Sequence, residues 1–397
     1  MEQFMLPKLL YIGDVPIESS YHGSTLLYRL LADYPPEKLL VVEGNLHRSQ
    51  PERRLPDVRY ESLKVGTERL LRTRLHKFYS GILTRSAPTR VGRVEKLRGG
   101  FLPEAVLTVS HGYSWLTAAR FAAKHQLPLH LICHDDWPRV AILSVNAKSR
   151  LDNVFGSVYR QAASRLCISP FMRDAYRKRY GVDGDVLLPF READCLTYDE
   201  PPQRLLERSD GLAVAFGGTI NSPGYVRALK SLAEILFEMG GRLLIFSPLR
   251  TADARREGLD CRNIELCGLM KSNDLIRRFR NDVDVLFVPM SFDAADRANM
   301  ELSFPSKLTD YTAVGLPLLI HGPDYSSAVR WAVENPGVAE VVARDERQAQ
   351  IAALERLCVP SHRIALAETA LRKGNEFFSH DAAKRIFIAS VTRFQTN

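Results

Sequence analysis

The chain has 397 residues, of which 45% are hydrophobic and 25% are charged, as in a globular protein and unlike a disordered or fibrous one. This length exceeds a single ordinary core, and two domains are expected. The longest apolar runs, 286–290 and 316–320, are far shorter than the roughly 20 residues that cross a bilayer, so we expect no transmembrane helix. Residues 1–8 lack the pattern of a signal peptide, and we therefore expect a soluble, cytoplasmic protein.

The sequence contains six cysteines and no CxxC pair. Their closest spacing, Cys261 to Cys267, has no neighbouring cluster of histidines or cysteines. Buried free thiols are the expected outcome, and neither a disulfide framework nor a metal site is indicated.

The net charge of +8 is concentrated in residues 60–99, which hold ten Lys or Arg against three Glu. Such a segment attracts anionic lipid headgroups, phosphorylated molecules or nucleic acid, or it is a solvated and partly mobile basic loop. Because no nucleic-acid-binding motif accompanies it, no nucleic acid partner is expected. Apolar side chains stand among the cations, so the segment could hold the protein on an anionic membrane surface. These side chains are Leu70, Leu71, Leu75, Phe78 and Tyr79.

In the first half of the chain, short apolar runs alternate with helical patterns. Strands and helices of this length in alternation predict a parallel, doubly wound, Rossmann-like sheet. The expected strands are 8–13, 39–43, 105–109, 127–133, 165–168 and 185–188, and the expected helices are 24–33, 115–124, 149–163 and 171–180.

The Pro-rich stretch 199–204 has the composition of a linker, and the same alternation starts again beyond it. We therefore expect one Rossmann-like domain over 1–198 and a second over 205–375. Within 376–397, an amphipathic helix at 381–394 is expected to pack back on the first domain. In the second domain, the expected strands are 212–216, 242–246, 264–267, 283–288 and 316–320, and the expected helices are 223–238, 273–280, 305–314 and 326–334.

The strongest local pattern lies in residues 301–317. Pro305 suits a first helical position and Gly315 a helix end, which predicts the short helix 305–314. Lys307 stands in the first turn, where the helix dipole disfavours a cation unless an anion binds there. Asp310 lies three residues further on the same face and could accept hydrogen bonds from a ribose diol. The alternative is a surface ion pair between Lys307 and Asp310.

This segment contains Ser-x-Pro-x-Lys-x-x-Asp-Tyr-x-Ala-x-Gly-x-Pro, which resembles the donor-site motif of GT-B glycosyltransferases, especially the retaining family-four-like group. The resemblance extends over the element order of the whole chain, and it includes 165–173 and 187–190. It implies a GT-B fold, with two Rossmann-like domains facing a cleft. It also implies that a nucleotide-diphosphate sugar, rather than a further cofactor, is held mainly by the second domain and the acceptor by the first.

The resemblance implies roles for individual residues. Lys307 would contact the diphosphate and act in catalysis, and Asp310, where the family usually has Glu, would bind the ribose. Leu269 and Met270 would lie against the nucleobase. The other residues expected to line the donor in the second domain are Gly218, Thr219, Ser303, Phe304, Pro305 and Ser306.

In the first domain, residues 131–139 end an apolar strand with polar side chains, at the strand end where α/β sheets bind ligands. His134 resembles the family's histidine that contacts the donor sugar, and we expect it to be catalytic. Asp135, Asp136 and Arg139 could orient it or the acceptor. The alternatives are a histidine capped by carboxylates for structural reasons and a metal site, although adjacent residues on a strand point to opposite faces.

Two further loops follow predicted strands of the first domain. Tyr21-His-Gly-Ser24 opens the first helix, and Gly23 could let the backbone approach donor phosphates or the acceptor. It is no dinucleotide fingerprint, because GxGxxG is absent. His111-Gly-Tyr-Ser-Trp115 either shapes an acceptor pocket or caps the following helix.

The chain departs from the family pattern at two places. Residues 216–224 lack the Arg and Lys that many members use to hold the diphosphate, although Gly218 and Thr219 still allow close approach of a ligand. The family's first acidic residue corresponds to Leu302, and Glu301 is one residue away. These departures keep a non-catalytic GT-B-like binding or scaffold protein open as an alternative.

The resemblance implies an enzyme of the hexosyltransferase type. It would transfer a sugar to a glycan, glycolipid or other acceptor in polysaccharide biosynthesis, with retention and without a metal. A lipid-linked acceptor would place it as a peripheral protein on the inner face of the membrane. A nucleotide-sugar epimerase or hydrolase on the same fold is the other enzymatic alternative.

Overall fold

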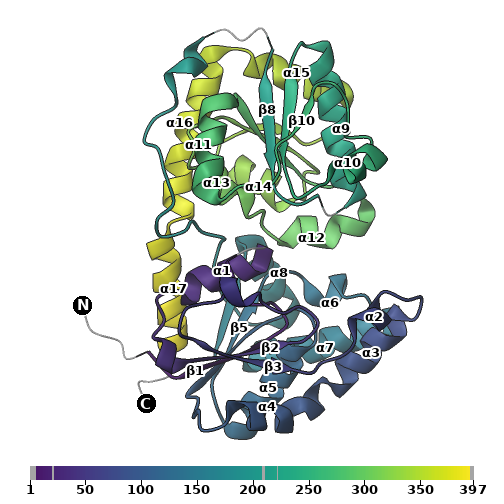
Figure 1. Cartoon of the computed structure of the whole chain (residues 1–397), viewed down its shortest axis with the longest axis vertical. Coiled ribbons are helices and arrows are strands. Elements are labelled where there is room, and N and C mark those ends of the chain that lie inside the picture. Colours follow the sequence, from purple (N-terminus) through teal and green to yellow (C-terminus); the bar gives the residue numbers. More distant parts are fainter. Residues whose placement is uncertain (1–5, 20–21, 208–210, 221, 394–397) are drawn as a thin grey trace. The chain divides into compact units, whose positions relative to one another are not determined.

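The computed structural model describes residues 6–19, 22–207, 211–220 and 222–393. They form two compact units: unit 1 comprises Met1–Leu188 and Asp381–Asn397, and unit 2 comprises Pro189–His380. Each unit contains one sheet of parallel strands with helices on both faces (Figure 1). The predicted fold class, two doubly wound α/β domains, is therefore confirmed.

Unit 1 is built on a seven-stranded sheet with the order β3-β2-β1-β4-β5-β6-β7. Its central strands are buried along their whole length because helices cover both faces. The strands are β1 (Leu9–Gly13), β2 (Leu39–Gly44), β3 (Arg59–Leu63), β4 (Ala105–Val109), β5 (Leu129–Cys133), β6 (Ser164–Cys167) and β7 (Asp185–Val186). The α-helices are α1 (His22–Leu31), α2 (Glu68–Leu71), α3 (His76–Ser86), α4 (Val91–Arg98), α5 (Ser114–His125), α6 (Trp137–Val140), α7 (Val145–Gln161), α8 (Pro170–Tyr180) and α17 (His380–Thr392).

Unit 2 has a six-stranded sheet with the order β10-β9-β8-β11-β12-β13. The strands are β8 (Ala213–Gly217), β9 (Arg242–Phe246), β10 (Ile264–Leu266), β11 (Val285–Pro289), β12 (Leu318–His321) and β13 (Glu340–Val342). The α-helices are α9 (Pro223–Glu238), α10 (Thr251–Glu257), α11 (Ser272–Asp282), α12 (Arg297–Leu302), α13 (Lys307–Tyr311), α14 (Ser327–Glu334), α15 (Arg347–Leu357) and α16 (Pro360–Phe377).

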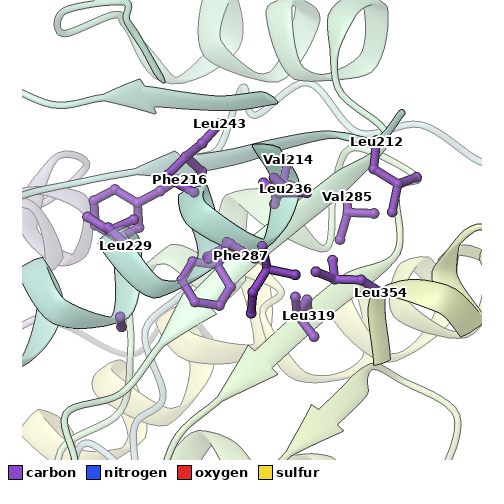
Figure 2. Close-up of a cluster of buried hydrophobic side chains, with 14 of the residues drawn as sticks. Leu212, Val214, Phe216, Leu229, Leu236, Leu243, Val285, Phe287, Leu319 and Leu354 are labelled. Atoms are coloured by element: carbon purple, nitrogen blue, oxygen red, sulfur yellow. The ribbon is translucent and has the colours of Figure 1, made fainter. Parts of the chain in front are cut away.

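The core of unit 2 lies between the sheet and helices α9 and α15 (Figure 2). Alternate residues of a strand point to the same face, so Val214 and Phe216 of β8 meet Leu229 of α9 on this side. The alternate residues Ala215 and Gly217 face the other side, where the hydroxyl of Tyr311 contacts the backbone of Gly217. Burial on both faces explains why the sequence of these strands is almost continuously apolar.

Residues 189–204 belong to unit 2 rather than forming a free linker after a domain that ends at 198. Tyr198 N donates to Ala313 O, and Arg204 forms an ion pair with Asp284 at 2.8 Å. Backbone and guanidinium groups are thus satisfied by unit 2, which the Pro-rich composition did not indicate.

Arg191 ties this segment to the donor-motif helix. Its buried guanidinium donates from Nε to Thr309 O at 3.0 Å, and from Nη1 to Asn375 Oδ1 at 2.6 Å. Its Nη2 donates to Thr312 Oγ1 at 3.1 Å. Gly374 leaves room for this arrangement, since a Cβ there would lie 2.4 Å from Nη2.

We expect Arg191→Ala to lower the free energy of unfolding by about 3 kcal/mol, because Thr309 O and Thr312 Oγ1, both of buried residues, and Asn375 Oδ1 lose a charged donor. Urea denaturation with a fluorescence readout measures this change. Arg372→Ala is the control, since Arg372 is exposed and donates only to Thr369 on its own helix. Equal stability of the two variants would contradict the assigned role of Arg191.

The basic segment 60–99 is folded, so the alternative of a mobile loop is wrong. It contains β3 and helices α2, α3 and α4. Some of its cations are structural: buried Arg90 donates to Val65 O and Leu83 O. The strand at Arg59–Leu63 was not predicted because it lies at the sheet edge and exposes polar side chains.

The C-terminal helix α17 packs within unit 1 from Asp381 onward. Lys384 forms an ion pair with Asp33, and Arg393 forms one with Asp185 at 2.9 Å. Phe387 and Val391 of the same helix are buried. Within the described part of the chain, none of the helices has the length and apolar character required to span a membrane.

Candidate functional site

In unit 2, β8 ends in a glycine turn at the carboxyl edge of the sheet, where parallel α/β sheets bind ligands. Gly218 has φ of +133°, a conformation that side chains other than glycine rarely adopt. Tyr311 holds the start of this turn in place, because Gly217 N donates to the Tyr311 hydroxyl at 2.6 Å. Gly218 and Thr219 are partly exposed, so their backbone can meet a ligand.

Lys307 reaches the same glycine turn from α13. Its Cε lies 3.7 Å from the place where a Cβ on Gly218 would stand. Its Nζ lies 4.6 Å from the ring centroid of Phe216 and 5.2 Å from that of Tyr225, so two aromatic faces surround the ammonium group. No ion pair among the described residues includes Lys307. Burial lowers the pKa of Lys307 from its ordinary 10.5 to about 8, which leaves it mostly protonated at pH 7.

The donor-motif helix is shorter than predicted: α13 covers Lys307–Tyr311 rather than 305–314. At its start, Leu308 N and Thr309 N bond to the carbonyls three residues earlier, and turns of the same kind follow Asp310. These tighter bonds replace α-helical geometry on both sides. With so short a helix, the positive charge at this place comes from Lys307 itself.

Asp310 points toward α11 rather than forming the surface ion pair with Lys307 considered as an alternative. Ser272 Oγ donates to Asp310 Oδ2 at 3.1 Å, and Thr309 Oγ1 donates to Oδ1 at 3.2 Å. Ser272 begins α11, directly after the loop that holds Leu269 and Met270. Those two side chains are 57% and 39% exposed, so both are accessible to a ligand.

Residues 303–306, directly before Lys307, differ in which of their atoms a ligand could contact. Phe304 is buried against Trp331 and Phe378, with ring centroids 6.1 and 6.0 Å away, so only its backbone can face a ligand. Ser303 O accepts a hydrogen bond from Ser327 Oγ. The Pro305 ring is partly exposed and the Ser306 side chain is exposed, and neither position carries a capping bond to α13.

In unit 1, His134 follows β5 and lies against the start of α1. A Cβ on Gly23 would stand 2.6 Å from His134 Nδ1, so the glycine leaves the space that the imidazole occupies. His134 Nε2 is buried and has no hydrogen-bond partner among the described residues. Burial lowers the pKa of His134 to about 4, so the ring is neutral at pH 7. A water molecule or a ligand is needed to satisfy this nitrogen, as for His130 Nε2 and His321 Nδ1.

The carboxylates next to His134 do not cap it. Asp136 is fully buried and receives two hydrogen bonds from Arg179, at 2.8 and 2.9 Å. Asp135 Oδ2 lies 3.4 Å from His111 Nδ1. No hydrogen bond joins His134 to either carboxylate among the described residues, and the charge of Asp135 partly opposes the lowering of the His134 pKa. Tyr21, which opens the predicted loop before Gly23, lies outside the described residues.

A cavity of about 190 Å³ in unit 1 is lined in part by the loop 111–115, whereas the cap of α5 comes from a residue outside this loop. His111 and Gly112 line it, while Asp14 caps α5 by accepting from Ser114 N and Ser114 Oγ, each at 2.7 Å. Gly112 has φ of +69°, and a Cβ there would collide with Asp14. Several residues that line this cavity were not predicted from the sequence. Only Asp14 had a recognisable signal, because it lies directly after the end of strand β1. These residues are Asp14, His47, His76 and Ser80.

Among the described residues, no group of three or more His, Cys, Asp or Glu is placed to hold a metal ion. All six cysteines are free thiols, and Cys133 and Cys167 are buried. The expectation of buried thiols is wrong for Cys261, whose side chain is exposed.

No protein-family model and no curated protein sequence matches the chain. Solved structures do resemble it over nearly its whole length. HepE of Anabaena, in complex with UDP and glucose, has a TM-score of 0.68 at 12% identity and covers 97% of this chain and 99% of its own. The α,α-trehalose 6-phosphate synthase of Burkholderia multivorans has a TM-score of 0.66 at 14% identity, with 98% of each chain covered.

A third structure is the lipopolysaccharide outer core galactosyltransferase WaaB in its apo form. It has a TM-score of 0.61 at 14% identity and covers 97% of this chain and 99% of its own. These structures are GT-B glycosyltransferases. The chain therefore has the GT-B fold that the motif at 301–317 implies.

Proposed function

We propose that the protein is a glycosyltransferase that moves a hexosyl group from a nucleotide-diphosphate sugar to a glycan, glycolipid or other acceptor. The observation that supports this most is the ammonium group of Lys307 beside the Gly218 turn. Lys307 is partly buried, and a partly buried cation without an ion-pair partner among the described residues loses hydration that a ligand with negative charge would offset. A diphosphate at the turn would supply it.

Unit 2 would hold the donor. Lys307 would contact the diphosphate, together with the backbone of Gly218 and Thr219 and the strip Ser303, Phe304, Pro305 and Ser306. Asp310 would accept hydrogen bonds from the ribose hydroxyls, and Leu269 and Met270 would lie against the base. HepE and the trehalose-phosphate synthases suggest uridine nucleotides as the first to be tested.

Residues of both units would have a role in the reaction. When the bond between the sugar C1 and the diphosphate oxygen breaks and the acceptor oxygen bonds to C1, negative charge grows on the diphosphate. Lys307 would stabilise that charge, which lowers the barrier without a metal ion. His134 would contact the transferred sugar as a neutral ring, with Gly23 setting its position. We propose that the product keeps the anomeric configuration of the donor.

We also propose that the reaction takes place on the cytoplasmic face of a membrane, with a lipid-linked acceptor. A sugar carried by a lipid would explain why apolar and basic side chains gather in one exposed segment of unit 1.

The test of the reaction is release of nucleoside diphosphate from UDP-, GDP-, ADP- and dTDP-sugars, with and without glycan and glycolipid acceptors. Release that requires an acceptor is expected, and it should persist in EDTA. Proton NMR of the product then gives the anomeric configuration. Equal turnover without an acceptor would instead indicate an epimerase or hydrolase, and binding without turnover a scaffold protein.

Asp310→Ala should raise the KM for the donor about tenfold or more, because the ribose loses a charged hydrogen-bond acceptor. The kcat should change much less, since the ribose is remote from the bond that breaks. Ser272→Ala is the control: it removes only the hydroxyl that donates to Asp310 and should have a smaller effect. Initial rates over a range of donor concentrations decide between them. A fall in kcat with no change in KM would contradict ribose binding.

A further inference from the structure

Helix α3 in unit 1, together with Leu75 directly before it, exposes large apolar side chains on one side. Leu75, Phe78 and Ile82 are 63%, 70% and 46% exposed. Their spacing of three and then four residues places them on the same side of the helix. The opposite side packs into the unit through buried Ser80 and Leu83. An apolar stripe that the helix does not need for its own packing indicates an interaction surface.

Cations surround this stripe. Arg69, Arg74, Lys77 and Arg85 are exposed, and none of them belongs to an ion pair of the described residues. The one acidic residue of α2 and α3 is Glu68, and Arg72 neutralises it. Exposed apolar side chains bordered by unpaired cations match an anionic lipid surface, because the apolar groups enter the headgroup region and the cations remain with the phosphates.

A second segment of unit 1 also exposes apolar side chains. Ile142 and Val145, between α6 and the start of α7, are 60% and 83% exposed. Ile142 lines the 190 Å³ cavity of unit 1 together with Leu71 and His76, which come from the segment that carries the stripe. Leu75, Phe78 and Ile82 do not line the cavity, because α3 faces it with His76, Ser80 and Thr84 on the other side of the helix.

We propose that the α3 face formed by Leu75, Phe78 and Ile82, with Arg69, Arg74, Lys77 and Arg85 around it, docks on an anionic lipid bilayer. The proposal rests on the proposed function in one respect: it names the membrane surface on which that reaction would meet a lipid-borne acceptor. No transmembrane segment is required for this mode of binding.

Co-sedimentation with vesicles tests the proposal without any nucleotide or acceptor. Binding to phosphatidylcholine vesicles that contain phosphatidylglycerol is expected, with much weaker binding to phosphatidylcholine alone and a decline as salt increases. Leu75→Ser/Phe78→Ser/Ile82→Ser should lower the partition coefficient at least about tenfold. Arg74→Glu/Lys77→Glu should do the same.

Matched variants control for exposure and charge. Leu102→Ser changes an apolar residue of unit 1 that is 65% exposed outside the surface, and Arg120→Glu/Lys178→Glu reverses two exposed cations elsewhere on unit 1. Both should bind vesicles like the wild type. Binding that does not depend on phosphatidylglycerol, or a triple serine variant that binds like Leu102→Ser, would overturn the proposal. Donor turnover is measured separately, so its failure and the failure of docking are distinguishable.

Discussion

Lys307→Met should reduce kcat/KM for the donor by about 100-fold or more, because the diphosphate loses the charge that stabilises it as the sugar departs. Methionine keeps the length of the side chain and its contact with Phe216 and Tyr225. Since the variant no longer buries a cation, its melting temperature should stay the same or rise. Loss of activity with retained stability separates a role in binding from a role in folding.

The pH dependence of donor affinity gives a second readout for Lys307. Its pKa of about 8 lies below the ordinary 10.5, so the free site loses its charge as the pH rises through about 8. The Kd of the nucleoside diphosphate should therefore rise above pH 8, by up to about tenfold for each pH unit. The free energy of unfolding, by contrast, should increase as the pH rises from about 8 to 10.5. Over this range the unfolded chain binds more protons than the folded protein, so deprotonation disfavours unfolding.

Titration calorimetry from pH 7 to 9.5 measures this dependence, with Lys230→Met as the control for the loss of an exposed lysine. The control should follow the wild type. An affinity in Lys307→Met that equals that of the wild type over this range would rule out contact between Lys307 and the diphosphate.

His134→Ala should reduce kcat about 100-fold and leave the Kd of the nucleoside diphosphate nearly unchanged, because His134 belongs to unit 1 and would contact only the transferred sugar. The wild-type rate should not depend on titration of His134 between pH 5 and 8, since its pKa is about 4 and the ring is neutral throughout. Stopped assays of nucleotide release give kcat, and calorimetry gives the Kd.

Gly23→Ala tests the same ring without removing it. A Cβ at Gly23 would lie 2.6 Å from His134 Nδ1, so the imidazole has to move, and kcat should fall about tenfold or more. Gly92→Ala is the matched control, because Gly92 also lies in a helix of unit 1 and no atom is within 4 Å of its added Cβ. Equal kcat in both glycine variants would mean that the position of His134 does not matter for the reaction.

The strands of both sheets were predictable where they are buried. Runs such as Leu9–Gly13 and Val285–Pro289 are apolar on both faces because helices cover both sides of the sheet. Arg59–Leu63 and Glu340–Val342 were not predicted. The first carries polar side chains at a sheet edge, and the second has only three residues, too few to show a period.

The donor motif was predictable in part. Lys307 and Asp310 lie three residues apart in one short segment that matches a family pattern, so both could be recognised in the sequence. The contacts of Lys307 with the rings of Phe216 and Tyr225 could not be predicted from the sequence. These rings belong to a strand and a helix that are distant in sequence and meet Lys307 only after folding. The contact between Gly23 and His134 has the same origin, since it joins a helix start to the end of β5.

The most direct test of the account is a thermal-shift screen of the wild type with UDP, GDP, ADP, dTDP and their sugars. A ligand that binds only the folded protein raises its melting temperature. We predict a rise with one of these bases, which is absent in Lys307→Met and Asp310→Ala. No rise with any nucleotide, or an equal rise in both variants, would contradict a donor site at Lys307 and Gly218.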